Sequence, residues 1–215
     1  MKKLSIFFII VLGVTFMSCN RKTTLKGRVM NPITGEGIGG ATISASKTTL
    51  ELPGGYKTVE QTTSDANGDF LLEFKKSAAN IGVSTGNYYD IGWYQNGAIQ
   101  PGYYLPVQQG KNMKADFYAV PYGKLMGHIK NVNCESQNDT MWFKMKYEYG
   151  DDFLPGWSFA TPRIGCVDFS TNNPDKKEMG NHIVMIKIKK PSGTIIRYDT
   201  VFVNKDGITY YELFY

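Results

Sequence analysis

The sequence predicts an all-β protein with two β-sandwich domains. Runs of about four to eight residues, in which apolar and polar side chains alternate, recur along the chain with Gly, Pro, Asn and Asp between them. Successive side chains of a strand point to opposite faces, so each run has one face for a core and one for water. No segment after Cys19 shows the sustained 3.6-residue apolar period that indicates helices.

Three alternating runs open the first domain. Their apolar members are Leu25 and Val29, then Ala41, Ile43 and Ala45, then Phe70, Leu72 and Phe74. The segment from Asn31 to Gly40 separates the first two runs, and its proline and four glycines predict a turn. A second tight turn is expected between Thr63 and Phe70, with glycine at its sharpest point.

The order of these motifs resembles the carboxypeptidase regulatory-like domain. The motifs are Gly-Arg-Val at 27–29, Thr-Gly-Glu-Gly-Ile-Gly-Gly-Ala-Thr-Ile at 34–43 and Ser-Asp-Ala-Asn-Gly-Asp-Phe-Leu-Leu at 64–72. That family is similar to transthyretin, a seven-stranded β-sandwich, and it recurs in bacterial envelope proteins. The resemblance covers about residues 24 to 120 and implies a transthyretin-like fold for this part. It implies no activity, because one fold hosts many functions.

The N-terminus predicts a lipoprotein signal peptide at residues 1–18. Two lysines precede the apolar run Leu4 to Met17, which is too short to span a membrane but has the length of a secretory signal core. The residues Phe16-Met-Ser-Cys19 resemble a bacterial lipobox of the Bacteroidota type, although Phe16 stands where Leu is usual. The resemblance implies lipidation of Cys19, with residues 19–24 as a polar tether. An ordinary cleaved signal with a chance cysteine is the alternative.

Composition limits the location and the partners. The net charge of +5 at pH 7 is mild and includes Lys2 and Lys3 of the signal, and no arginine cluster occurs, so nucleic acid is not an expected partner. The tether lacks the acidic run that resembles a surface-export signal in Bacteroidota lipoproteins. We therefore expect a lipid-anchored protein on the periplasmic face of the outer membrane.

Domain boundaries are expected at residues 25–120 for the first sandwich and 124–215 for the second, with the seam at Pro121-Tyr-Gly123. Leu125-Met-Gly-His-Ile-Lys-Asn131 echoes Leu25-Lys-Gly-Arg-Val-Met-Asn31. The echo indicates either a second sandwich with a similar first strand or two strands that merely share a pattern. The chain is expected to end in a three-strand meander formed by Val184 to Ile188, Thr194 to Val203 and Ile208 to Tyr215.

No catalytic set, cofactor or metal is expected. His128 and His182 do not lie near a cysteine or carboxylate at ligand spacing, and no zinc-protease, nucleophile-elbow or phosphate-loop pattern occurs. Asp65-Ala-Asn-Gly-Asp69 alternates oxygen side chains, but Gly68 is fourth where a calcium loop has glycine sixth. In the resembled family this turn is structural. We therefore expect a protein that is not an enzyme.

Cys134 and Cys166 are the cysteines that remain when Cys19 is acylated. An even pair in an exported protein is usually oxidised. A disulfide would close a loop of about thirty residues and contribute about 3 kcal/mol through the unfolded state. Two buried thiols are the alternative.

Aromatic residues are the candidate binding groups. Those selected are Tyr89, Trp93, Tyr94, Tyr103, Tyr104 and, in an acidic loop of the second domain, Trp157. Adjacent aromatics in a strand point to opposite faces, so about half must face outward, where Tyr and Trp anchor partner proteins or stack on sugars. Cross-strand aromatic pairs that stiffen a sheet are the alternative.

Together these features predict a non-catalytic lipoprotein that binds or scaffolds another envelope protein. A glycan-binding lipoprotein of a nutrient-uptake system is the alternative function.

Overall fold

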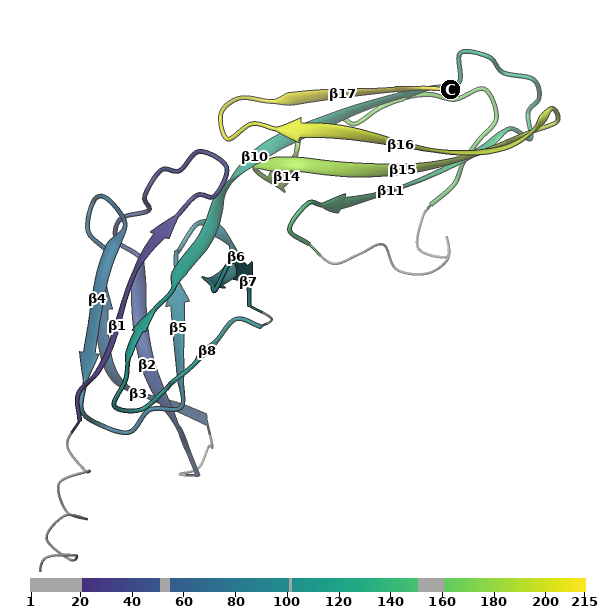
Figure 1. The fold of residues 1–215 in the computed structure, drawn as a ribbon. Coiled ribbons are helices and arrows are strands. Elements are labelled where there is room, and N and C mark those ends of the chain that lie inside the picture. Colours follow the sequence, from purple (N-terminus) through teal and green to yellow (C-terminus); the bar gives the residue numbers. More distant parts are fainter. Residues whose placement is uncertain (1–20, 51–54, 101, 151–160) are drawn as a thin grey trace, which may run out of the picture. The chain divides into compact units, whose positions relative to one another are not determined.

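The computed structural model describes residues 21–50, 55–100, 102–150 and 161–215. The described ranges contain 17 β-strands and no helix. The predicted all-β class is therefore confirmed (Figure 1). The chain divides into two units, Met1–Gly86 with Gly92–Ala119 and Asn87–Ile91 with Val120–Tyr215.

The first unit contains two sheets. In one, β1 (Thr23–Met30) is antiparallel to β4 (Asp69–Phe74) and parallel to β9 (Asn112–Lys114) and to the start of β10 (Asp116–Lys130). The other has the antiparallel order β3 (Gly55–Thr63), β2 (Thr42–Thr49), β5 (Asn80–Ser84) and β8 (Leu105–Pro106). A hairpin of β6 (Tyr88–Gln95) and β7 (Ala98–Ile99) extends the first sheet beside β10.

The core of the first unit lies between these sheets and follows the predicted alternation. Its buried side chains include Leu25, Val29, Ile43, Ala45, Phe70, Leu72, Phe74, Ile81 and Phe117. The residues between them in β4 are exposed, so the strand has one apolar and one solvent face.

Two glycine turns of the first unit pack against each other. The N–H of Val29 donates to the Gly68 carbonyl at 2.8 Å, and the N–H of Ile38 donates to the Val29 carbonyl at 2.8 Å. A Cβ on Gly37 would overlap the Asn67 carbonyl, and one on Gly68 would overlap the Val29 carbonyl. The two motifs that carry the family resemblance therefore need glycine because backbones approach closely.

The second unit also contains two sheets. From Val120 onward β10 is antiparallel to β14 (Asp175–Glu178) and β13 (Asp168–Ser170), and parallel to β17 (Thr209–Phe214). The other sheet has the antiparallel order β12 (Arg163–Ile164), β11 (Thr140–Tyr147), β15 (Gly180–Lys190) and β16 (Gly193–Val203). One buried cluster joins the sheets and contains Leu125, Ile129, Met141, Val184, Ile186, Ile188, Val201, Val203, Leu213 and Tyr215.

The two units share one strand connectivity. In each, the first strand is antiparallel to the fourth and parallel to the last, the second is antiparallel to the third and fifth, and the fifth is antiparallel to the sixth. The first unit adds the β6–β7 hairpin, and the second splits its fourth strand into β13 and β14. Leu25 to Met30 and Leu125 to Lys130 lie in the corresponding first strands. The echo thus coincides with a topological repeat.

The glycines of the echo have different surroundings. A Cβ on Gly27 would overlap the Ala115 carbonyl of the same unit, whereas one on Gly127 would meet only the Thr171 Cγ2, at 4.0 Å. Gly27 is required for close packing and Gly127 is not. The shared glycine is therefore not what makes the units alike.

The expected seam, Pro121-Tyr-Gly123, follows the division of the two units at Ala119 and Val120 and lies inside β10. The Pro121 carbonyl accepts the Met179 N–H at 2.9 Å, and glycine at 123 lets the Asn204 backbone approach. One expectation about the elements is wrong. The expected meander is only a β15–β16 hairpin, because β17 pairs in parallel with β10 and not with β16. The apolar face of β17 completes the core from the opposite sheet.

Candidate binding surface

Trp93 was expected among the outward aromatics, and the structure corrects this. Its side chain is fully buried and meets Phe70 and Phe117 edge to face, at ring-centroid distances of 6.3 and 5.3 Å. The alternation of β6 breaks at Gly92, whose φ of 130° favours glycine, and Gly92 and Trp93 are both buried. Alternation alone does not say which aromatic takes the core side, and here the largest one does.

Tyr89 and Tyr94 form half-buried cross-strand contacts. Tyr94 stacks on Tyr118 of β10 at 4.8 Å with 17° between the ring planes. Tyr89 meets Tyr122 at 6.4 Å and Tyr147 at 5.5 Å, both edge to face. The contacts of Tyr94 with Tyr118 and of Tyr89 with Tyr122 fit the alternative of aromatic pairs that stiffen a sheet. The contact of Tyr89 with Tyr147 joins β6 to β11 of another sheet.

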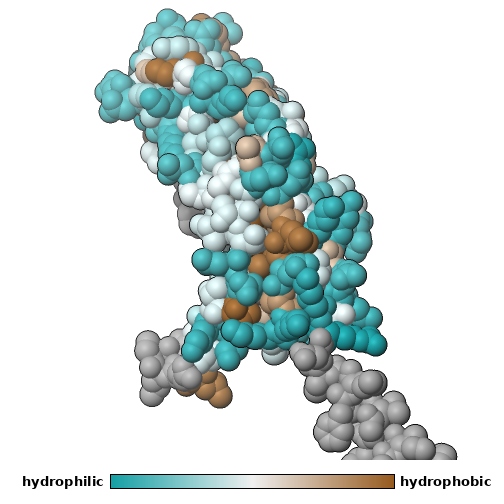
Figure 2. Space-filling view, turned by 90° about the vertical axis from the view of Figure 1, so that its left-hand side faces the viewer, coloured by the Kyte–Doolittle hydropathy of each residue, from teal (hydrophilic) through white to brown (hydrophobic). Residues whose placement is uncertain are grey.

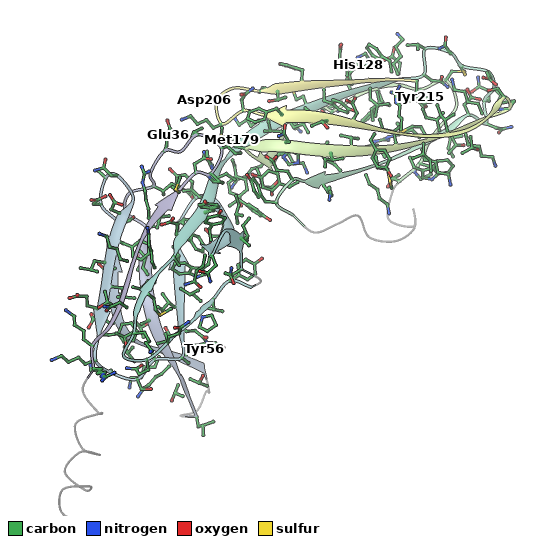
Figure 3. All side chains as sticks on the ribbon, viewed as in Figure 1. Glu36, Tyr56, His128, Met179, Asp206 and Tyr215 are labelled. Atoms are coloured by element: carbon green, nitrogen blue, oxygen red, sulfur yellow. A yellow bond between two sulfur atoms is a disulfide. The ribbon has the colours of Figure 1, made fainter. Side chains whose placement is uncertain are left out.

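Tyr103 and Tyr104 are the predicted residues that face solvent. Their exposed fractions are 71% and 51%. Tyr56, labelled in Figure 3, was not among the predicted residues and is 59% exposed. The rings of Tyr56 and Tyr104 stack at 5.7 Å with 28° between their planes. We call these three residues the tyrosine surface.

Gly82 makes room for the tyrosine surface. It lies on β5, and a Cβ there would be 3.1 Å from the Tyr104 Cε1 atom. Gly82 pairs with Ser44 of β2. The preceding residue of β5, Ile81, pairs with Leu105 of β8. Since Ile81 and Leu105 are buried, Gly82 and Tyr104 belong to the outer face of this sheet.

Exposed apolar residues are not gathered into one large area in the view of Figure 2. Figure 2 shows a face on which hydrophilic residues predominate and apolar ones form small clusters. Isolated exposed apolar groups are ordinary on protein surfaces, whereas grouped aromatic rings mark contact sites. In the described part of the first unit, the stacked and exposed rings of Tyr56 and Tyr104 are such a group.

Two predicted site residues, Cys19 and Trp157, lie outside the described residues. Lipidation of Cys19 and binding through Trp157 stay predictions.

Cys134 and Cys166 are joined by a disulfide in the structure. Beside it the Asp139 carboxylate is buried and accepts hydrogen bonds from Asn131 Nδ2, from the N–H groups of Glu135 and Ser136, and from Ser136 Oγ, at 2.9 to 3.1 Å. Burial raises the pKa of Asp139, but these donors outweigh it and hold the pKa below the usual range. The loop that leads into β11 is thus fixed covalently and by hydrogen bonds.

The structure brings His128 to carboxylates that the sequence did not indicate. His128, which Figure 3 labels, has its Nε2 2.7 Å from Asp168 Oδ1, and Lys130 Nζ lies 2.7 Å from Asp168 Oδ2. Hydrogen bonds from Lys130 and His128 lower the pKa of Asp168. These partners come from neighbouring strands β10 and β13, and all three side chains are accessible to water, so the cluster resembles a solvated surface network more than a water-excluded catalytic centre.

The other histidine has a structural environment. His182 is buried, its Nε2 lies 2.8 Å from the Glu178 carbonyl, and its ring packs on Tyr147 at 5.1 Å. Burial raises the pKa of Tyr147, whose hydroxyl donates to the Met179 carbonyl at 2.6 Å. In the described ranges no three His, Cys, Asp or Glu side chains are placed to hold a metal ion.

The Asp65 carboxylate accepts hydrogen bonds from the backbone of the turn in which it lies. Its Oδ1 accepts the N–H groups of Asn67 and Asp69 at 2.8 and 2.9 Å. This is the hydrogen-bond pattern of an Asx turn. The alternating oxygens of this loop are therefore explained by backbone support.

Comparison with known proteins assigns no family. No protein-family profile and no curated protein matches the sequence. Among solved structures, the Bacillus anthracis TIE protein aligns at 14% identity and a TM-score of 0.32 over 91% of this chain and 34% of that protein. The chain therefore spans about a third of the TIE protein.

Two further structures align over most of their own length. The shaft pilin SpaA of Lactobacillus rhamnosus GG has 7% identity and a TM-score of 0.28 over 91% of this chain and 97% of the pilin. A DUF3823 family protein of Parabacteroides merdae has 9% identity and a TM-score of 0.28 over 86% of this chain and 100% of that protein. At these values the likenesses carry no functional argument. Within the part of the chain that the structure describes, no helix is long and apolar enough to cross a membrane.

Proposed function

We propose that this protein is a non-catalytic module of the cell envelope that holds another protein through the tyrosine surface. The observation that carries the proposal is the exposed, stacked pair of Tyr56 and Tyr104 with Tyr103 beside it in sequence. Tyrosine contributes a large contact area with few rotatable bonds, and it is enriched where proteins bind each other. Stacking orders two of the rings before binding, which lowers the entropy lost on association.

The ring geometry favours a protein over a glycan. A sugar platform needs two or three coplanar rings with open faces, whereas Tyr56 and Tyr104 turn one face toward each other at 5.7 Å. Tyr103, 71% exposed, is the ring that a sugar could use. A glycan-binding lipoprotein of a nutrient-uptake system is thus the second candidate.

The proposal includes a membrane anchor. Cys19, preceded by an apolar run of signal length, would be the lipidated N-terminus of a Bacteroidota-like lipoprotein, held on the periplasmic face of the outer membrane. Two acyl chains suffice for stable anchoring where one does not.

We infer further that the first unit is a carboxypeptidase regulatory-like domain. Its two packed glycine turns and its seven-stranded connectivity, with the β6–β7 hairpin as an addition, support this inference. The equal connectivity of the second unit supports a tandem of such folds, with boundaries near residues 25–120 and 124–215.

A polysaccharide array together with cross-linking in native membranes separates the two candidates. We expect wild type to recover one protein partner in a stoichiometric adduct, and the double variant Tyr56→Ser with Tyr104→Ser to lose it. Tyr210→Ser, 70% exposed in the second unit, is the matched control and should keep it. Saturable binding to a polysaccharide that Tyr103→Ala abolishes, with no protein adduct, would replace the scaffold function by the glycan one. Trp93→Ala does not serve this test, because Trp93 is a core residue.

A further inference from the structure

An exposed basic surface covers the end of the first unit at which β1 begins. Thr23 of β1 pairs with Phe74 at the end of β4, and the N–H of Thr24 donates to the Lys111 carbonyl at 3.0 Å. Ser46 of β2 pairs with Asn80 at the start of β5, so the β2–β3 hairpin continues past the same end. The exposed cationic side chains here are Arg21, Lys22, Lys47, Lys57, Lys75, Lys76 and Lys111. We call them the basic end.

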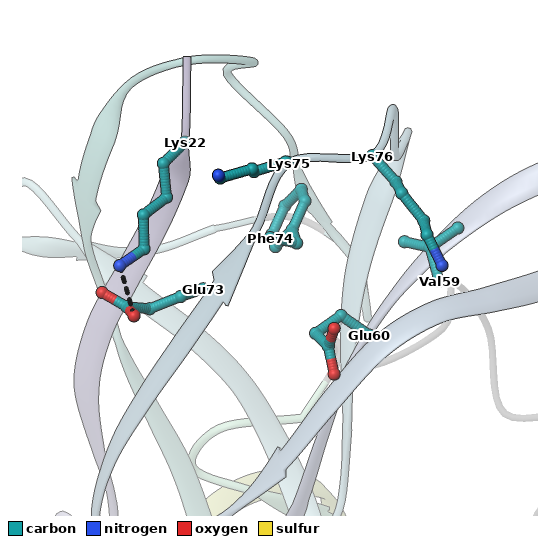
Figure 4. A pocket seen from close by; sticks show the side chains of 7 residues that line it. All are labelled: Lys22, Val59, Glu60, Glu73, Phe74, Lys75 and Lys76. Atoms are coloured by element: carbon teal, nitrogen blue, oxygen red, sulfur yellow. Dashed lines mark ion pairs between the residues drawn. The ribbon is translucent and has the colours of Figure 1, made fainter. Parts of the chain in front are cut away.

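The basic end has few carboxylates to neutralise it. Among its described neighbours, Glu60 and Glu73 line a pocket of about 320 Å³ together with Lys22, Lys75 and Lys76 (Figure 4). Lys22 pairs with Glu73 at 2.5 Å. No ion pair in the described part of the chain involves the other six cations. Several positive charges are therefore available to a ligand at one end of a chain whose total net charge is only +5.

The proposed lipid on Cys19 would hold the basic end close to the membrane surface. Cys19 precedes Lys22 by three residues, and three residues span at most about 11 Å. If Cys19 carries acyl chains, as proposed above, the basic end is held within reach of the lipid headgroups. Leu50 follows β2 at this end and is 95% exposed, which offers an apolar group to the same interface.

We propose that the basic end binds anionic phospholipid headgroups, so that the first unit rests on the membrane to which Cys19 tethers it. Basic side chains near an anionic bilayer each strengthen binding about fivefold, and the attraction fades within a Debye length. Binding by the chain alone is weak, and the lipid anchor supplies the local concentration that makes it effective.

Sedimentation with lipid vesicles tests the proposal without the lipid anchor. Protein expressed from Asn20 onward keeps every described strand, and we expect it to bind vesicles of phosphatidylglycerol and phosphatidylethanolamine but not vesicles of phosphatidylcholine. Lys75→Gln with Lys76→Gln should weaken binding about 25-fold, from about fivefold for each lysine. Lys124→Gln with Lys189→Gln removes the same charge from exposed sites of the second unit and should leave binding unchanged.

Salt and fold controls complete the experiment. Binding should disappear at 1 M salt, where the Debye length is about 3 Å. Equal melting temperatures of the two double variants show that neither has unfolded. Equal weakening by the two variants, or binding that ignores lipid charge, overturns the proposal. Fatty-acid labelling in cells does not depend on these lysines. If the wild-type protein is labelled in cells but its lipid-free form does not bind anionic vesicles, the proposal for the basic end is wrong and the proposed lipid anchor is unaffected.

Discussion

Gly68 and Gly35 illustrate two reasons why a position requires glycine, a positive φ and the close approach of another backbone segment. Both have positive φ, 82° and 75°, but a Cβ on Gly68 would strike the Val29 carbonyl whereas nothing lies within 4 Å of one on Gly35. The left-handed conformation alone costs an alanine about 1–2 kcal/mol. The difference between the two positions is therefore the close approach of the turns.

We predict that Gly35→Ala lowers the free energy of unfolding by about 1–2 kcal/mol and Gly68→Ala by about 4 kcal/mol or more, because the Val29–Gly68 hydrogen bond must also break. Urea unfolding of the two variants measures this. Equal losses would show that the turns do not pack as described.

Asp139 makes the second unit sensitive to acid. A carboxylate whose pKa is lowered in the folded state stabilises the fold above its unfolded pKa of about 3.9, and that stability is lost as the pH falls through the folded pKa. We predict that Asp139→Asn lowers the melting temperature at neutral pH and flattens its fall below about pH 4. Asp206→Asn, at an exposed turn, is the control and should follow wild type (Figure 3). If the melting temperature of Asp139→Asn falls with pH as steeply as that of wild type, the Asp139 carboxylate does not cause the sensitivity to acid.

The sequence predicted where buried and exposed residues alternate, but it did not predict which side chains distant in sequence are in contact. The buried face of β4 was predictable because Phe70, Leu72 and Phe74 repeat at two residues. Trp93 was assigned to the wrong face because tyrosines surround it and Gly92 shifts the alternation. The Tyr56–Tyr104 stack and the His128–Asp168 pair join residues 48 and 40 positions apart. No local pattern encodes such contacts.

At the scale of elements, the disulfide joins the loop between β10 and β11 to the segment between β12 and β13. Cys134 and Cys166 are 32 residues apart and bonded in the structure. We predict that protein recovered from the envelope, alkylated before lysis, yields the linked peptide in mass spectrometry without reduction. The double variant Cys134→Ser with Cys166→Ser should lose about 3 kcal/mol of stability, since its unfolded chain regains the freedom of an open loop. Two free thiols in the alkylated material would refute the bond.

Strands were missed where alternation is weak. β3 presents exposed or half-exposed residues along its whole length, and β5 carries one fully buried side chain, Ile81, so neither has a clear apolar face in the sequence. β10 was divided at Pro121-Tyr-Gly123 because proline and glycine usually end a strand. Here the carbonyl of Pro121 still pairs, which a sequence cannot reveal.

At the scale of the whole molecule, the repeat of connectivity gives the short sequence echo a structural basis. Each unit buries the first and fifth residues of the echo, Leu25 with Val29 and Leu125 with Ile129, and then buries an asparagine, Asn31 or Asn131. The surroundings of the shared glycine, Gly27 or Gly127, differ between the units. Seven residues were too few to reveal the shared connectivity, which the pairing of the strands in each unit shows.

The anchor is tested in growing cells. We predict that a clickable fatty acid labels the wild-type protein and not Cys19→Ala, because the acyl chains attach to that cysteine after signal cleavage. Membrane fractionation should place only the labelled form with the outer membrane. Labelling of Cys19→Ala, or a wild type that stays unlabelled, would remove the anchor from the account.

The central claim, that the tyrosine surface holds a protein, is tested most directly by a photo-reactive amino acid at position 103 in living cells. Benzoylphenylalanine in place of Tyr103 should give one discrete protein adduct on irradiation, and the same group in place of Tyr210, which is equally exposed at 70%, should not. Adding Tyr56→Ser with Tyr104→Ser should remove the adduct. An adduct of equal yield from both positions, or none from position 103, would contradict the claim.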